Sequence, residues 1–135
     1  MIERPFERKS MRPQLLRLPV VLMSVTFVAL GTAALLVPDI ASALYGVDAT
    51  THSARAFVRA AGARDIAIGG ILLGLLARHV ESRTVGITVL ATTLVPIVDA
   101  VIVFQASGVR PATVLHAGSI LPMLILAIAL IGARD

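Results

Sequence analysis

The chain has 135 residues, of which 57% are hydrophobic, and its mean hydropathy is +0.92. A soluble domain of this length cannot bury so large an apolar share, so the composition indicates an integral membrane protein. The chain contains no cysteine, which excludes disulfides, thiolate catalysis and cysteine-ligated iron–sulfur clusters. Its net charge of +4 is explained by basic residues that flank the apolar segments and lie beside anionic lipid headgroups. We therefore expect the lipid bilayer as a partner, and no nucleic acid.

Four apolar segments are each close to the length of about 20 residues that a helix needs to cross the hydrocarbon core. They cover residues 18–37, 58–77, 85–105 and 112–132. The last two connections are short, which forces neighbouring helices to run antiparallel. The sequence therefore predicts an all-α fold: a basic tail over residues 1–17, followed by one up-and-down bundle of four transmembrane helices over residues 18–135. The first segment is too long for the apolar core of a signal peptide, so we expect it to be retained.

Lysine and arginine are concentrated on the side of the bundle that holds both termini. That side carries eight basic residues: Arg4, Arg8, Lys9, Arg12, Arg17, Arg78, Arg83 and Arg134. The opposite side carries Arg55 and Arg110, with Arg59 at the mouth of the second segment. Because cytoplasmic flanks are enriched in these residues, both termini are predicted to be cytoplasmic. We expect a multi-pass protein of a bacterial cytoplasmic membrane.

Three ionisable residues, Asp65, Asp99 and His116, lie inside three different apolar segments. At about 1.5 Å of rise per residue, all three are predicted to lie roughly 6 to 10 Å below the outer edge of the hydrocarbon core. Charge in hydrocarbon is costly and usually marks a substrate or proton pathway. We therefore take these residues as candidate catalytic groups, with a protonated carboxylate as the acid and His116 or the other carboxylate as the base.

Candidate substrate-binding residues lie on the same helix as Asp65. Gly62 and Gly69 share its face and leave room for a ligand, water or a neighbouring backbone. Arg59 or Arg64 would hold an anionic group of the substrate. Arg64 lies about 100° from Asp65 around the helix, so we do not expect these two side chains to pair directly. Arg64 is expected either to reach the outer interface or to cross to Asp99.

The third segment aligns Thr88, Thr92 and Asp99 on one face. Thr92 is the fifth candidate for substrate binding, although threonines in membrane helices also bond to carbonyls of their own helix. Pro96 and Pro122 each remove a backbone hydrogen bond, and kinks there could open a polar cavity.

The opposite face of the second segment carries only small residues: Ala63, Ala67, Gly70 and Gly74. Packing within the bundle is the ordinary interpretation of such a face, and a homodimer is the alternative. The connection between the first two segments, which holds Tyr45, Asp48 and His52, is either a lid over the outer mouth or a plain linker. Two carboxylates and an imidazole suit a divalent ion, but no short ligand spacing supports one, so neither a metal nor a cofactor is predicted.

The second segment reads Arg59-Ala-Ala-Gly62-Ala-Arg64-Asp65-Ile-Ala-Ile-Gly69, and Asp99 and His116-Ala-Gly118 follow in the next two. This pattern resembles a domain-of-unknown-function family of small four-span membrane proteins from bacteria and fungi. The resemblance covers about residues 55–123. It implies the four-span fold and supports the choice of candidate site residues, but it implies no reaction.

Three functions remain open. The first is binding of a lipophilic small molecule from the outer leaflet, or acid–base chemistry on it, at the site of Asp65, Asp99 and His116. The second is a structural or accessory membrane protein in which these groups and Arg64 clamp the helices together. The third is a small proton-coupled transporter that uses Asp99 and the threonines as a relay.

Overall fold

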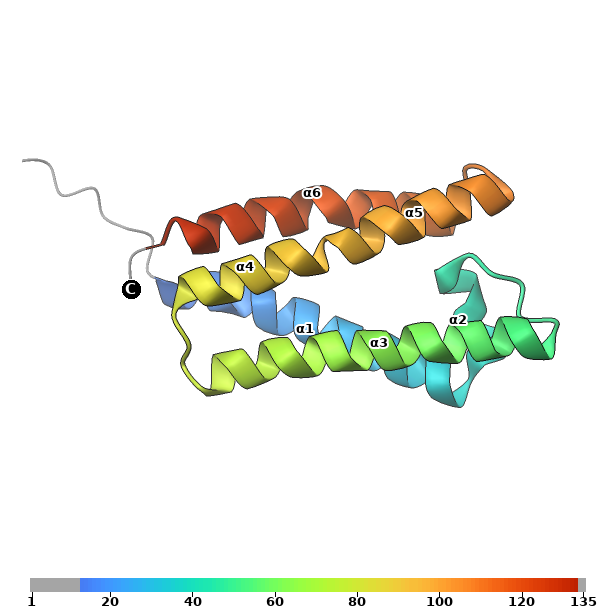
Figure 1. Ribbon diagram of the computed structural model, residues 1–135, viewed down its shortest axis with the longest axis horizontal. Helices are drawn as coiled ribbons and strands as arrows, with labels where there is room; N and C mark the ends of the chain where they lie inside the picture. The colour runs from blue at the N-terminus through green and yellow to red at the C-terminus, as the bar shows by residue number, and fades with distance from the viewer. Residues whose placement is uncertain (1–12, 134–135) are drawn as a thin grey trace, which may run out of the picture.

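The structure, a computed structural model, describes residues 13–133, and every regular element within them is a helix (Figure 1). The helices are α1 (Pro13–Leu36), α2 (Pro38–Tyr45), α3 (His52–Ala77), α4 (Ser82–Thr92), α5 (Leu94–Ser107) and α6 (Pro111–Ile131). The all-α prediction is confirmed. Most of the predicted basic tail and Arg134 lie outside the described residues, and the end of that tail already belongs to α1.

Four stretches are long and apolar enough to cross a membrane, which makes the chain a multi-pass membrane protein. They are Leu15–Leu36, His52–Ala77, Ser82–Ser107 and Pro111–Ile131, each within a few residues of the predicted segment. The largest difference is at the start of α3. This helix begins before the apolar run because the Thr51 side chain accepts a hydrogen bond from the Ala54 backbone N–H at 3.1 Å and caps the first turn.

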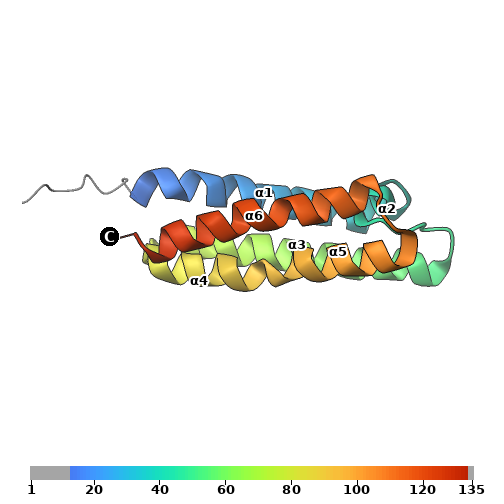
Figure 2. The ribbon, with the colours of Figure 1, turned by 90° about the horizontal axis from the view of Figure 1, so that it is seen from above.

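The four long helices form two antiparallel pairs. α1 packs along α3, and α4 and α5, which together form the third span, pack along α6. Figures 1 and 2 together show α6 lying over α1 and the α4–α5 segment lying over α3. The chain passes from one pair to the other once, through the turn between α3 and α4. The short α2 lies at the end of the bundle opposite this turn, where it contacts α1, α3 and α6.

Glycine allows α1 and α3 to approach closely. A Cβ atom on Gly62 would lie 2.7 Å from the Gly31 carbonyl oxygen and 2.6 Å from the Ala34 Cβ. A Cβ on Gly69 would lie 2.6 Å from the Ser24 carbonyl oxygen. Of the three expected occupants of the space beside Asp65, namely a ligand, water or a neighbouring backbone, the structure has the backbone of α1. These two glycines therefore do not face a ligand.

The small-residue face of α3 is left unpacked. Its residues are exposed, and a Cβ added to Gly70 or Gly74 would meet nothing within 4 Å. Packing within the bundle is therefore the wrong interpretation of this face, because the Gly62 and Gly69 side of the helix takes that role. A homodimer through Ala63, Ala67, Gly70 and Gly74 stays a prediction.

The third span is interrupted between α4 and α5, near Thr93. Pro96 has no N–H to donate to the Thr92 carbonyl one turn earlier, which accounts for a break at this point. At the break, the Thr93 hydroxyl donates to the Val89 carbonyl, one turn earlier in α4, at 2.9 Å. Pro122, in contrast, lies inside α6 without interrupting it.

Candidate functional site: a groove with a charged end

A groove of about 870 Å³ runs between α1 and α6. Along α1 it is lined by Leu16, Pro19, Met23, Thr26, Phe27 and Leu30, which share one face of the helix. From Leu16 to Leu30 this wall is about 21 Å long at 1.5 Å per residue. The facing wall on α6 runs from Leu115 to Ala129 and includes Pro122, while Pro96 contributes from α5. A groove of this volume accommodates one small lipophilic molecule.

Five polar residues from four helices line this groove, and we call them the polar cluster: Tyr45, Arg64, Asp65, Asp99 and His116. Almost all the remaining lining residues are apolar. The expectation that Asp65, Asp99 and His116 face one common space is thus met by the geometry. Their catalytic roles stay a prediction.

Arg64 connects the two carboxylates. Its Nη1 and Nη2 atoms donate to the two oxygens of Asp99 at 3.1 and 2.9 Å, and its Nε donates to Asp65 Oδ1 at 3.0 Å. Of the two alternatives for Arg64, the crossing to Asp99 is the one found. The expectation that it would not pair with Asp65 is wrong, because the flexible stem and the wide guanidinium bridge the angular offset. This residue therefore ties α3 to α5, and so joins the two helix pairs.

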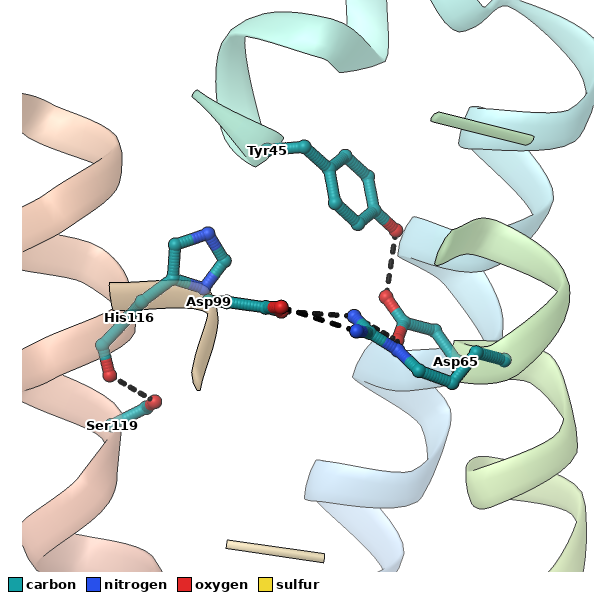
Figure 3. Close-up of polar contacts among 6 residues, drawn as sticks. Tyr45, Asp65, Asp99, His116 and Ser119 are labelled. Atoms are coloured by element: carbon teal, nitrogen blue, oxygen red, sulfur yellow. Dashed lines mark hydrogen bonds and ion pairs between the residues drawn. The ribbon is translucent and has the colours of Figure 1, made fainter. Parts of the chain in front are cut away.

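Asp65 is 4% exposed, and both of its oxygens are engaged. Its Oδ2 accepts a hydrogen bond from the Tyr45 hydroxyl at 2.7 Å, which Figure 3 shows reaching down from α2. Sequence reasoning assigned Tyr45 only to a lid or linker and missed this contact. The available signal was that Tyr45, the single tyrosine of the chain, ends a short apolar run just before Gly46.

Local geometry fixes α2 at the end of the groove. Gly46 ends the helix in the left-handed region (φ 68°), and its backbone packs so close to Val103 that a Cβ would lie 2.6 Å from Cγ1. At the other end, Arg55 Nε donates to Asp39 Oδ1 at 2.7 Å. Because α2 places Leu44 and Tyr45 in the groove wall, this connection is not a plain linker.

His116 differs from the rest of the polar cluster. Its Nε2 atom is buried and has no hydrogen-bond partner in the described part of the chain. Its ring and Asp99 both line the groove, and the Ser119 hydroxyl donates to the His116 carbonyl at 2.8 Å rather than to the ring (Figure 3). An unpaired buried polar atom costs roughly 1–3 kcal/mol, so His116 is the group with the most to gain from a bound molecule.

The model of a family described as a domain of unknown function, DUF4267, matches residues 24–130. The chain belongs to this family. The match extends from α1 to α6 and contains the whole polar cluster, and it confirms the resemblance to a domain-of-unknown-function family found in the sequence. No curated protein and no solved structure matches the chain significantly.

Several candidates from the sequence do not line the groove of this DUF4267 protein. Arg59 is exposed, and Gly62 and Gly69 pack against α1. The Thr92 hydroxyl donates to the Thr88 carbonyl at 2.8 Å, and Thr88 donates in turn to the Thr84 carbonyl, so these threonines satisfy their own helix. Among residues 13–133, no three His, Asp or Glu side chains gather closely enough to hold a metal ion.

The titration of Tyr45 tests whether this side chain is buried against Asp65 in the DUF4267 protein. Burial, and then the hydrogen bond to Asp65, raise the pKa of Tyr45 well above its ordinary value of about 10. The folded state thus binds the Tyr45 proton more tightly than the unfolded chain does. The contribution of protonated Tyr45 to the stability of the fold is therefore complete below about pH 10 and falls as the pH rises further. The chain has one tyrosine and no tryptophan, so tyrosinate absorbance reports Tyr45 alone. We expect the folded protein to show no tyrosinate just above about pH 10.

The unfolded chain provides the control for this titration. In strong denaturant, tyrosinate should form near about pH 10, the value for a solvated phenol. Ionisation at the same pH in both states would show that Tyr45 is solvated and does not contact Asp65.

Proposed function

We propose that this DUF4267 protein binds a single-chain lipophilic molecule that enters the groove between α1 and α6 from the bilayer. The proposal rests on one observation: a long apolar groove carries a polar cluster in which one buried nitrogen has no partner. The sides of both helices that do not line the groove are apolar and exposed, for example at Leu18, Leu22, Val114 and Ile128. The groove therefore lies between two faces that lipid would cover.

The polar cluster is the part of the groove that gives selectivity. A hydrocarbon chain gains little by leaving lipid tails for an apolar groove, since the two environments are equally apolar. Net affinity must then come from close packing and from polar contacts that lipid cannot offer. The polar end of the ligand would pair with His116 Nε2, and its chain would lie along the apolar wall toward Leu16.

The distribution of basic residues supports an orientation for the site. Arg17, Arg78 and Arg83 lie at the end of the bundle where α1 begins and α3 meets α4, whereas α2 covers the other end. Basic flanks favour the cytoplasmic side, so both termini are cytoplasmic in this proposal and the polar cluster lies toward the outer leaflet. A location in a bacterial cytoplasmic membrane stays a prediction.

Acid–base chemistry on the bound molecule is the second candidate, and His116 carries it. Asp65 and Asp99 are both committed to Arg64, so within this proposal they position the cluster and His116 is left to exchange a proton. His116→Gln keeps a hydrogen-bonding side chain but cannot take up a proton. Under this candidate the variant retains ligand binding, and lipid extracts of cells producing it accumulate the unconverted substrate.

The binding proposal is tested by blocking the groove without touching the polar cluster. Thr26 lines the groove on α1, whereas Thr32 on the same helix is exposed and does not line it, and each hydroxyl donates only to a carbonyl of its own helix. We expect the Thr26→Phe variant to bind labelled dodecanol in lipid nanodiscs about tenfold more weakly than the wild type, because the ring fills the space of the chain. Thr32→Phe should bind it as the wild type does.

Circular dichroism of each variant would establish that the bundle is intact. Equal dodecanol binding by the wild type and by both variants would reject the groove as a binding site. A structural role, in which the contacts of Arg64 clamp the helices together, would then be favoured, because that role does not need a ligand in the groove.

A further inference from the structure

The polar cluster has an excess of negative charge. Arg64 contributes one formal positive charge, and Asp65 and Asp99 contribute one negative charge each, so with a neutral His116 the sum is +1 − 2 = −1. No other Lys, Arg, Asp or Glu lines the groove in the described part of the chain. The apolar walls screen this charge far less than water would.

The cationic group of the cluster is already engaged. All three nitrogens of Arg64 donate to carboxylate oxygens, at 2.9 to 3.1 Å. The Tyr45 hydroxyl also donates its hydrogen bond to Asp65. An incoming carboxylate or phosphate would find no cation in the groove whose charge is not already balanced by Asp65 and Asp99.

The unpartnered Nε2 atom of His116 accepts a hydrogen bond when the proton of the neutral imidazole is on Nδ1, and it then needs a donor from the ligand. An ammonium head offers three N–H donors and one positive charge, so it can pair with His116 and a carboxylate oxygen together and balance the excess of −1. A hydroxyl offers one donor and no charge.

Resting on the binding function proposed above, we propose that the groove selects single-chain amphiphiles with a primary ammonium head and rejects those with an anionic head. The hydrocarbon chain sets only the fit along α1 and α6. The charge balance of the polar cluster sets the choice of head group.

Three probes with the same chain separate these contributions: labelled dodecylamine, dodecanol and dodecanoate. Binding to the wild type in nanodiscs of zwitterionic lipid would be measured at neutral pH, with partition into protein-free nanodiscs subtracted and each affinity referred to the probe concentration in the bilayer. The Thr26→Phe variant defines the part of the binding that depends on the groove. We expect dodecylamine to bind about tenfold more tightly than dodecanol, and dodecanoate to bind most weakly.

The outcomes distinguish the two proposals. If no probe shows binding that depends on the groove, the binding function itself fails. If the probes bind but dodecanoate equals dodecylamine, or dodecylamine is no better than dodecanol, the inference about the head group alone is overturned.

Matched carboxylate variants locate the charge that selects the amine. Asp99→Asn brings the formal charge of the cluster to zero and should remove the advantage of dodecylamine over dodecanol. Asp48→Asn, at an exposed carboxylate outside the groove, should leave it unchanged. If Asp99→Asn does not fold, the comparison of the three probes on the wild type still decides the question.

Discussion

Replacing Arg64 with methionine is expected to lower the free energy of unfolding by about 3 kcal/mol, the largest effect of any single change in the polar cluster. The variant leaves Asp65 and Asp99 facing one low-dielectric space with no cation between them, and removing one partner of a buried ion pair costs roughly 3–5 kcal/mol. The lower end applies because the Arg64 side chain is 35% exposed. Equilibrium unfolding in mixed micelles, followed by circular dichroism, measures this loss.

Variants at two arginines of α3 serve as controls for Arg64→Met. Arg59→Met changes an exposed residue outside the groove and should cost less than about 0.5 kcal/mol. Arg64→Lys keeps the charge but loses the paired donation to Asp99, so an intermediate cost is expected. Adding Asp99→Asn to Arg64→Met should restore part of the stability, because one unpaired charge is removed. If Arg64→Met and Arg59→Met cost the same, Arg64 does not hold the helix pairs together.

The second large effect is expected at Gly62. Changing it to alanine should destabilise the bundle by about 2–3 kcal/mol, because the new Cβ would lie 2.7 Å from the Gly31 carbonyl oxygen and 2.6 Å from the Ala34 Cβ. A backbone carbonyl cannot turn aside as a flexible side chain can, so α1 would have to move away from α3. The same unfolding measurement reports this loss.

Gly70→Ala is the matched control for Gly62→Ala, on the same helix and with the same chemical change. A Cβ on Gly70 meets nothing within 4 Å, so the higher helix propensity of alanine should stabilise the protein by up to about 1 kcal/mol. Opposite signs for the two variants identify the Gly62 face as the packed one. A loss at Gly70 similar to that at Gly62 would indicate that the small-residue face is covered, as it would be in a homodimer.

The spans and the convergence of the ionisable residues were predictable because both depend on local properties. Twenty apolar residues in a row define a span wherever they occur. A regular helix then converts sequence position into depth, which placed Asp65, Asp99 and His116 near one level. Kinks were expected at both Pro96 and Pro122, since each lacks the N–H that a continuous helix needs, but an interruption is found only near Pro96.

What could not be predicted depends on partners far along the chain. Both faces of α3 carry small residues at helical spacing, and the choice between them depends on Gly31 and Ser24 in α1. The contact between Tyr45 and Asp65 needs α2 to fold back over the groove. The pairing of Arg64 with both carboxylates depends on the conformation of a long side chain, which helical phase does not determine.

The chain crosses between the two helix pairs once, at the turn between α3 and α4, so the backbone joins the pairs at that end of the bundle. There Arg17 of α1 donates to the Val80 carbonyl at 3.2 Å. The ion pair of Arg64 with Asp99 joins the same two pairs within the bundle. A ligand head that paired with Asp99 and weakened this ion pair would couple ligand affinity to the separation of the helix pairs, and by reciprocity a change in that separation would shift affinity by the same coupling free energy.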